Sequence, residues 1–307
     1  MNSGLILLNK KPGITSFDAL RDIKRSLGTG KVGHTGTLDK FASGLLIVLV
    51  GKALKLSQWF TNCDKKYKGR ICFGIETDTL DPEGSIIAKA DLPTRELIED
   101  VLKQFRGEIK QIPPVYSAIH INGKRASALA REGVTPEMKK RPVTIHEIEL
   151  LSWDPPFADV FVHCSSGTYI RSLARDIALA AESRGYLIEL ERTQVAGFVL
   201  AEVENPEKLS PRCGGAEIAK NIKLIDKNVI DKLVMPWFEV TQQEAEYIKH
   251  GKPLEMFLEG KQLSSSASLR LCENDFFQQA TAVFCGETLV AIIEKNDEKW
   301  KYGCVFN

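Results

Sequence analysis

The feature that most constrains the fold is the order of strand-like and helix-like segments along the chain. Residues 45–50 form an unbroken apolar run that ends at Gly51, which is typical of a buried strand. Residues 16–27 place apolar side chains at helical spacing, with Thr15 or Ser16 as the N-cap and Gly28 closing the helix. Such segments alternate irregularly, without a repeating strand–helix–strand unit. This order predicts an α+β fold, a mixed sheet with helices packed on it.

The C-terminal part of the chain has a different texture. Residues 203–234 contain proline, paired glycines and mixed charge, which indicates a short helical region or linker. From Pro236 onward, short strand-like runs and turns predominate, for example at residues 282–284 and 289–293. We therefore predict two domains, residues 1–235 and residues 236–307, of which the second is a small β domain.

Composition narrows the class of protein. The chain has 307 residues, of which 43% are hydrophobic and 26% are charged, an ordinary balance for a globular protein. Its apolar runs all fall short of the roughly 18 residues of a membrane span. The apolar run at residues 5–8 is too short for a signal peptide, so we expect a cytoplasmic protein without a membrane partner.

The cysteines argue against a disulfide framework or a zinc site. There are seven, an odd number, and none are arranged as C-x-x-C. We expect buried or half-buried free thiols.

The charge is distributed unevenly. Residues 1–70 contain 13 Lys or Arg and 4 Asp or Glu, a net charge of +9, whereas the whole chain carries +1. A basic N-terminal third suits a polyanion such as a nucleic acid, because phosphate contacts release counterions. An ordinary solvated charged face is the alternative, and charge alone does not decide between them.

A glycine-rich loop at residues 33–39 is the sharpest local motif. Its glycines allow close approach to a ligand, and Asp39 stands at its end beside Lys40. An aspartate can act as a nucleophile when a cation keeps it ionised, but taken locally Asp39 reads more readily as a turn cap. His34 has no second histidine at ligand spacing, so no metal site is expected here.

Two further positions suit nucleic-acid chemistry. Tyr67 lies on a predicted strand among Lys65, Lys66 and Lys68, as expected of a ring that stacks on a base beside phosphates. A half-buried strand tyrosine is the simpler alternative. Arg171 falls in the first turn of a predicted helix, where it can pair with a carboxylate or phosphate, although surface arginines on helices are common.

Taken together, these motifs resemble the bacterial tRNA pseudouridine-55 synthase (TruB) family over residues 4–198. The resemblance is carried by ordered blocks: Leu8-Asn9-Lys10 with Gly13-Ile14-Thr15-Ser16, Gly33-His34-Thr35-Gly36-Thr37-Leu38-Asp39, Asp64-Lys65-Lys66-Tyr67, Thr77-Asp78-Thr79-Leu80-Asp81, Gln111-Ile112-Pro113-Pro114-Val115-Tyr116-Ser117-Ala118, Cys164-Ser165-Ser166-Gly167-Thr168-Tyr169-Ile170-Arg171 and Leu190-Glu191-Arg192-Thr193. The resemblance implies the pseudouridine synthase type of mainly antiparallel mixed sheet. It also implies isomerisation of the T-loop uridine of tRNA by a monomer that needs no cofactor, metal or obligate protein partner.

The resemblance assigns roles by position. It implies that Asp39 is the catalytic nucleophile, that Tyr67 stacks on the flipped uracil and that Arg171 pairs with Asp39. For RNA binding it implies a second set of residues: His34, Lys10, Leu190, Lys65 and Lys66.

Two departures from the family pattern concern the turn and one RNA contact. Pro12 is displaced by one position because Lys11 precedes it, and Glu191 stands where an arginine is common. The family's C-terminal domain is typically an RNA-binding PUA module, but residues 236–307 equally suit a family-specific β extension. Two alternatives for the whole chain are an RNA chaperone that folds tRNA without chemistry and a synthase that depends on guide RNA.

Overall fold

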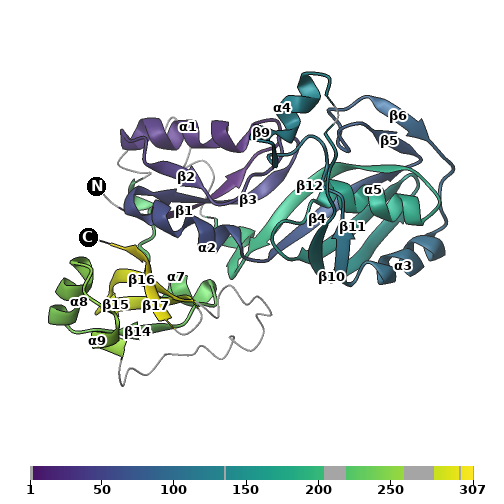
Figure 1. The fold of residues 1–307 in the computed structure, drawn as a ribbon. Coiled ribbons are helices and arrows are strands. Elements are labelled where there is room, and N and C mark those ends of the chain that lie inside the picture. Colours follow the sequence, from purple (N-terminus) through teal and green to yellow (C-terminus); the bar gives the residue numbers. More distant parts are fainter. Residues whose placement is uncertain (1–2, 135, 204–218, 259–279, 297–298, 307) are drawn as a thin grey trace.

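The computed structural model describes residues 3–134, 136–203, 219–258, 280–296 and 299–306. Nine strands form its main sheet: β1 (Gly4–Lys10), β2 (Val32–His34), β3 (Ser43–Val50), β4 (Lys65–Phe73), β7 (Gly107–Gln111), β10 (Arg141–Asp154), β11 (Phe157–Cys164), β12 (Gly185–Val195) and β13 (Phe198–Val199). The strand order is β1-β3-β12-β4-β11-β10-β7, with β2 beside β3 and β13 beside β12 (Figure 1). Only β12 and β3 pair in parallel among the described strands of this sheet. The predicted mixed, mainly antiparallel sheet is confirmed.

The first helix, α1 (Ser16–Leu27), follows the local sequence signals closely. The Thr15 side chain accepts a hydrogen bond from the backbone N–H of Asp18, and the Asp18 carboxylate accepts one in return from the backbone of Thr15. Gly28 ends the helix with a φ of +59°, in the left-handed region that glycine enters without strain. The helix buries Leu20 and Ile23 against strands β1 and β3. The predicted helix and its caps are therefore confirmed.

Two helices cover one face of the sheet around β4, β10 and β11. They are α3 (Arg95–Gln104) and α5 (Ile170–Ala180), and both lie beside β10 and β11 in Figure 1. Val101 of α3 and Ile177 of α5 share a buried cluster with Ile71 of β4. Between β3 and β4, the chain passes through η1 (Gly51–Leu56) and α2 (Ser57–Thr61). The layered α+β arrangement thus packs α3 and α5 over the part of the sheet that contains β4.

Short elements extend from the main sheet. They are β5 (Ile75–Thr77), β6 (Ile86–Lys89), β8 (His120–Ile121), β9 (Lys124–Arg125) and α4 (Ala126–Arg131). β5 pairs with β6, and β8 pairs with β9. In Figure 1, α4 stands at the top of the molecule. The predicted surface excursion over residues 120–142 therefore contains a small hairpin and one helix.

The C-terminal part forms a second, smaller sheet. Two short helices precede this sheet, η2 (Leu200–Glu202) and α7 (Lys227–Lys232). The described elements of the C-terminal part are then β14 (Trp237–Glu239), α8 (Gln242–Lys249), α9 (Glu255–Leu258), β15 (Ala280–Cys285), β16 (Thr288–Asn296) and β17 (Lys299–Val305). The strands are ordered β14-β15-β16-β17. Helix α8 was not predicted, although Thr241 and Glu244 form a capping box at its start. The predicted small C-terminal sheet is confirmed, with helices added to it.

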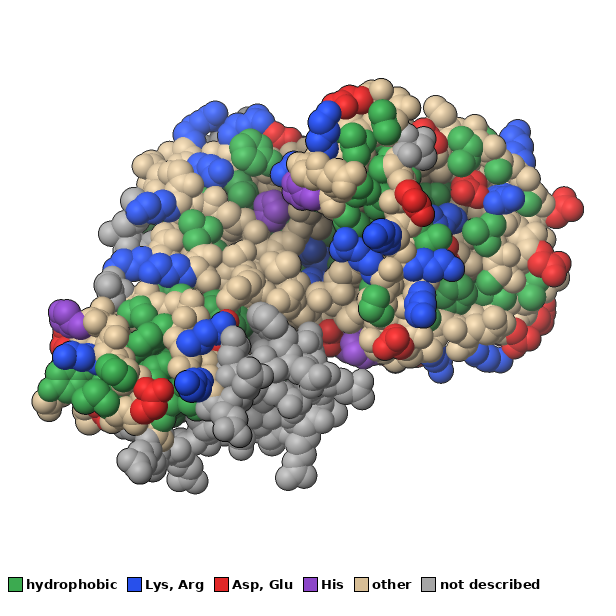
Figure 2. Space-filling model, in the orientation of Figure 1, with side chains coloured by type: hydrophobic (Ala, Val, Ile, Leu, Met, Phe, Trp, Pro, Cys, Tyr) green, Lys and Arg blue, Asp and Glu red, His purple; other side chains and the backbone are tan. Residues whose placement is uncertain are grey.

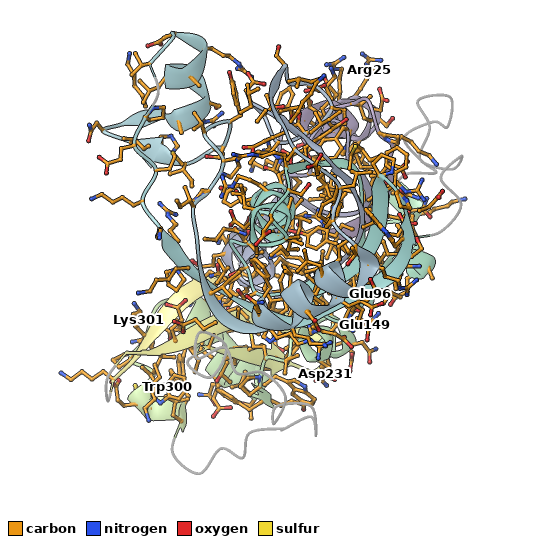
Figure 3. The ribbon with its side chains drawn as sticks, turned by 90° about the vertical axis from the view of Figure 1, so that its right-hand side faces the viewer. Arg25, Glu96, Glu149, Asp231, Trp300 and Lys301 are labelled. Carbon is orange, nitrogen blue, oxygen red and sulfur yellow. The ribbon has the colours of Figure 1, made fainter. Side chains whose placement is uncertain are left out.

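The two sheets share apolar contacts. Phe284 of β15 and Ile292 of β16 belong to one buried cluster with Leu5 of β1 and Trp59 of α2. In the side view, Glu96 of α3 and Glu149 of β10 lie to the right of Trp300 and Lys301 of β17 (Figure 3). The division at residues 235 and 236 stays a prediction, and part of the predicted linker, residues 204–218, lies outside the described residues.

Five cysteines fall within the described residues, and all are free thiols. Cys63, Cys72 and Cys164 are buried, and Cys285 and Cys304 are half-buried. The prediction of free thiols is confirmed for these five, while residues 213 and 272 lie outside the described ranges. No helix in the described part of the chain is long and apolar enough to cross a membrane.

Candidate active site

The loop that carries Asp39 is fastened at two points. The Ser16 hydroxyl, at the start of α1, donates to the carbonyl of Leu38 (2.9 Å) and accepts from its N–H (2.8 Å). The Arg192 guanidinium, on β12, donates from Nη2 to the carbonyl of Gly36 (3.1 Å) and from Nε to that of Leu45 (2.8 Å). Because Ser16 and Arg192 are both buried, these bonds fix the loop in an environment that excludes water.

Gly44 lets the loop's strand approach β12. Its φ is +103°, and a Cβ at this position would lie 2.4 Å from the carbonyl oxygen of Arg192. Any side chain here would push β3 away from β12. The close approach brings Leu190 and Arg192 beside the segment that ends in Asp39.

Arg171 holds Asp39 from the other side. Its Nη2 donates to Asp39 Oδ1 (3.2 Å), and its Nε lies 2.9 Å from Asp39 Oδ2. Nη1 donates to Asp81 Oδ2 (3.1 Å) and to the Thr79 carbonyl (2.8 Å), and Nη2 also donates to the Tyr116 carbonyl (3.0 Å). The Arg171 side chain is 5% exposed, whereas that of Asp39 is 37% exposed. The arginine is thus fixed and buried, and the Asp39 carboxylate remains open to a ligand.

The start of α5 is positioned by a neighbouring strand end. Gln111, at the end of β7, accepts from the N–H of Tyr169 (2.9 Å) and donates to its carbonyl (3.1 Å). Since Tyr169 is the N-cap residue of α5, this amide sets where the helix begins. Arg171 follows in the first helical turn, as predicted.

A cleft of about 520 Å³ opens over these residues. Three predicted catalytic residues line it together: Asp39, Tyr67 and Arg171. Its charged lining comprises six cations (Lys40, Lys65, Arg125, Arg131, Arg171 and Arg192) and three anions (Asp39, Asp81 and Glu83), a difference of +3. In Figure 2 a hollow opens below α4, and Lys and Arg side chains gather beside it. The cleft is therefore an electropositive recess that contains the partly exposed Asp39 carboxylate.

Burial and charge shift the pKa values of Asp39, Tyr67 and Lys65, which line the cleft, and of Lys10, which is buried beside it. Burial raises the pKa of Asp39, Arg171 opposes this shift, and the neighbouring Asp81 carboxylate adds to it. Burial also raises the pKa of Tyr67 to about 12. It lowers the pKa of Lys65 from 10.5 to about 8, and that of Lys10 likewise, although the Asp39 carboxylate opposes the shift at Lys10. Several perturbed groups in one cleft are typical of a catalytic site.

The residues predicted to bind RNA occupy different environments. Leu190 lines the cleft, and Lys65 lines it while donating from Nζ to the carbonyls of Thr61 and Cys63 (2.5 Å each). Lys10 is buried, and its Nζ donates to the carbonyls of Lys11 (3.0 Å), Ile14 (2.7 Å) and Lys40 (3.4 Å). These two amines therefore stabilise backbone turns at the site.

His34 and Lys66 lie outside the set that lines the cleft. His34 is half-buried on β2, burial lowers its pKa, and its Nδ1 has no hydrogen-bond partner among the described residues. Lys66 pairs in register with His163 and Gln194, on the opposite face of β4 from Tyr67. Neither side chain faces Asp39 in this conformation.

The two departures from the family pattern have clear positions. The N–H of Gly13, just after Pro12, donates to the carbonyl of Lys40 (2.8 Å), so the displaced turn remains tied beside Asp39. Glu191 pairs in register with Lys68 on the outer face of the sheet. The substituted position therefore does not face the cleft.

Two residues of the site received no role from the sequence. Asp81 is the second carboxylate on Arg171, and Arg192 links β12 to the loop before Asp39. Both fall within the blocks that carry the family resemblance, which is the only signal that pointed to them. Their partners lie about 90 and 156 positions away in the sequence, so spacing could not reveal the contacts.

Comparisons with known proteins agree with this geometry. The family described as "TruB family pseudouridylate synthase (N terminal domain)" matches residues 24–170. The tRNA pseudouridine synthase B of Borreliella burgdorferi is 49% identical over 213 residues, which cover 68% of this chain and 76% of that relative. The protein of the same name from Francisella tularensis subsp. novicida is 42% identical over 245 residues, covering 79% and 80%.

Among solved structures, the chain in the crystal structure of a Cbf5-Nop10-Gar1 complex superposes with a TM-score of 0.67 and 26% identity. The superposition covers 95% of this chain and 78% of that one. Fold and site together define the pseudouridine synthase class. Within that class, the chain belongs to the TruB family.

Proposed function

We propose that this chain converts the T-loop uridine of tRNA, position 55, to pseudouridine, with Asp39 as the catalytic nucleophile. The observation that carries the proposal is the placement of Asp39. Its carboxylate is held on Arg171 at 2.9 and 3.2 Å, is still 37% exposed, and shares an electropositive cleft with Tyr67. The relatives named tRNA pseudouridine synthase B supply the substrate class.

The chemistry requires no electron transfer and no added atom. The bond between N1 of uracil and C1′ of ribose breaks, a bond between C5 and C1′ forms, C5 loses its proton and N1 gains one. The target base is stacked in its loop, and flipping it out costs a few kcal/mol. Phosphate contacts from the cationic rim and stacking on Tyr67 offset that cost. Attack by Asp39 on the sugar, attack on the base, or assistance to C2′ proton loss all suit this placement.

The test is the Asp39→Asn variant, assayed by tritium release from tRNA that carries 5-tritiated uridine. The amide keeps the shape of the carboxylate but cannot act as a nucleophile. We expect turnover to fall by roughly 10³-fold or more, while the Kd for tRNA changes little. Glu189→Gln, which changes an exposed carboxylate on the outer face, is the matched control and should retain activity. An RNA chaperone would release no tritium even as the parent protein. Turnover by Asp39→Asn at the parental rate would refute the assignment of Asp39 as the nucleophile.

A second candidate is the alternative predicted from the sequence, a synthase that depends on guide RNA. The likeness to a chain solved in complex with Nop10 and Gar1 favours the need for protein partners. The greater identity to the tRNA pseudouridine synthase B relatives favours independent action on tRNA. Purified protein is expected to modify an isolated T-arm hairpin at its T-loop uridine. If the hairpin remains unmodified until guide RNA or partners are added, the independent reading fails.

A further inference from the structure

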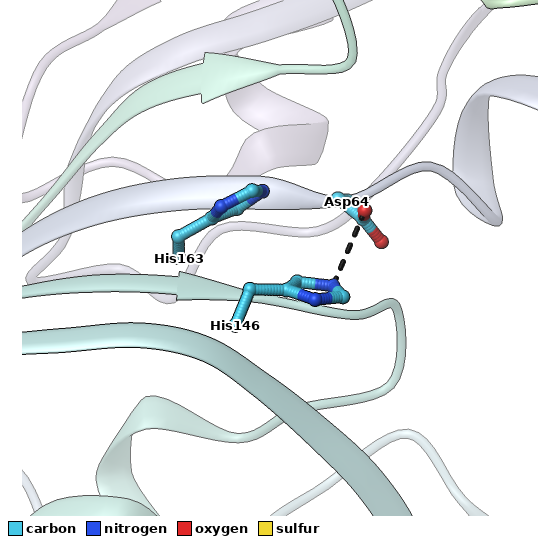
Figure 4. Close-up of side chains that lie close together, drawn as sticks. All are labelled: Asp64, His146 and His163. Atoms are coloured by element: carbon cyan, nitrogen blue, oxygen red, sulfur yellow. Dashed lines mark ion pairs between the residues drawn. The ribbon is translucent and has the colours of Figure 1, made fainter. Parts of the chain in front are cut away.

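A cluster of two histidines and one aspartate lies on the outer face of the main sheet. Asp64 immediately precedes β4, His146 is on β10 and His163 is on β11. Figure 4 shows the three side chains converging, and Asp64 Oδ2 lies 3.3 Å from His146 Nε2. The two imidazole rings have centroids 4.7 Å apart with planes inclined at 44°. One donor atom from each residue lies within 4.8 Å of the other two.

A break in strand register creates the cluster. On β10, Ile145 pairs with Cys164 and Glu147 pairs with His163, so His146 is an extra residue in a β-bulge. A bulge redirects the side chain of its extra residue. Here it turns His146 toward His163 and toward Asp64, which lies just beyond the pairing of Lys65 with Cys164. The convergence is thus a specific local departure from a regular ladder.

The donor set suits a transition-metal ion. Imidazole nitrogen and carboxylate oxygen bind zinc at about 2.0–2.2 Å, which in a tetrahedron separates neighbouring donors by about 3.3–3.5 Å. The pair Asp64 and His146 already has this separation.

The cluster is also accessible. The His146 side chain is 24% exposed and that of Asp64 is 27% exposed, so an ion can enter and keep water as a further ligand. Two charged side chains also lie near His163: Lys66 is positive and Glu147 is negative, so their electrostatic effects on the site oppose each other. An ordinary ion pair between Asp64 and His146 explains their contact, but it does not require His163.

We propose that Asp64, His146 and His163 form a binding site for one divalent transition-metal ion, with zinc as the expected occupant. The three ligands come from three adjacent stretches of the sheet, so the ion ties the start of β4 to β10 and β11. Asp64 is followed at once by Lys65, and Tyr67 comes two residues later, both of which line the cleft. The ion therefore clamps the strand ends that carry the cleft and leaves the reacting groups untouched.

The test measures metal binding by the full-length protein after removal of metals with a chelator. Zinc binding is followed by calorimetry and cobalt binding by its visible absorption, because cobalt spectra distinguish nitrogen and oxygen ligands from thiolates. We expect one ion per chain and a Tm rise of about 3 °C or more at saturating zinc.

Variants identify the ligands. His146→Gln and His163→Gln keep polar side chains of similar size, and each is expected to weaken binding at least tenfold and abolish the Tm shift. His120→Gln and His250→Gln change histidines outside the cluster and should bind as the parent protein does. Circular dichroism establishes that each variant folds. Unchanged affinity in His146→Gln and His163→Gln, a thiolate spectrum with cobalt, or no binding at millimolar zinc would each overturn the proposal.

Discussion

The two faces of β4 place the residues of one basic segment in different environments. Toward the cleft, Lys65 and Tyr67 are 7% and 8% exposed, and burial shifts the pKa values of both. Toward the outside, Lys68 is exposed, and Arg70 forms two hydrogen bonds to Asp159 at 2.7 and 2.9 Å. The sequence alone does not distinguish these four residues, because all of them lie within the same basic segment of six consecutive positions.

The difference teaches that strand alternation, and not local charge, selects the residues available for chemistry. Successive side chains of a strand point to opposite faces. One face of β4 lines the cleft with Asp39, Arg171 and Arg192. The other face lies beside the cluster of Asp64, His146 and His163 and carries surface ion pairs such as that of Arg70. Substitutions on the cleft face should therefore change catalysis, and matched substitutions outside should not.

The largest effect is expected for Arg171→Met. This change removes the cation between Asp39 and Asp81 and leaves the buried Asp81 carboxylate, 8% exposed, without its partner. Breaking a buried pair in this way costs about 3–5 kcal/mol, and we expect the free energy of unfolding to fall by about that amount. Activity should fall by roughly 10³-fold. Urea unfolding and tritium release measure the two effects.

Arg70→Met is the matched control, because it removes an arginine from a carboxylate on the outer face of the same sheet. It should leave turnover near that of the parent protein. Equal losses of activity in both variants would show that the two faces are not functionally distinct.

Tyr67→Phe is expected to have the next largest effect. The phenyl ring still stacks on a base, but it lacks the hydroxyl group that can assist removal of the C5 proton. General acid–base groups contribute about 10²–10⁴-fold, so we expect kcat to fall by roughly 10²-fold with little change in the Kd for tRNA. Tyr67→Leu should weaken binding as well, since stacking is worth about 1–3 kcal/mol per base. Turnover by Tyr67→Phe at the parental rate would limit the tyrosine to stacking.

A third prediction concerns pH and Lys65. Burial lowers its pKa from 10.5 to about 8 in the folded protein. Between these values the unfolded chain binds more protons than the folded one, so this lysine makes stability rise with pH from about 8 to 10.5. The free energy of unfolding of the parent protein minus that of Lys65→Met should therefore increase over this window. A difference that stays constant from pH 8 to 10.5 would contradict the lowered pKa of Lys65.

Elements of the fold could be predicted from local sequence patterns, whereas the grouping of the cleft residues could not. Periodicity located α1, whose Thr15 and Gly28 caps are local signals, and the strands that contain residues 45–50 and Tyr67. The predicted catalytic residues Asp39, Tyr67 and Arg171 do converge in one cleft, but locally each had a simpler structural explanation. Their grouping came from the ordered family blocks.

What the sequence did not reveal depends on contacts between distant strands. Asp81 and Arg192 act through partners far away in the chain. The Asp64, His146 and His163 cluster depends on a β-bulge, which leaves no spacing signature. Helix α8 is a different case, because its capping box was present in the sequence beside Thr241 and was outweighed by the strand-like segments around it.

The smallest effect, and the sharpest comparison, concerns phosphate contacts. The resemblance assigns Lys66 to RNA binding, yet its side chain lies on the outer face of β4, whereas Arg131 lines the cleft. Each lost phosphate contact reduces the slope of log K against log salt by about 1. We expect this reduction for Arg131→Ala and a slope within error of the parent protein for Lys66→Ala, from tRNA binding titrations at several salt concentrations. A reduction of similar size in Lys66→Ala would extend the RNA path around the edge of the sheet and across its outer face.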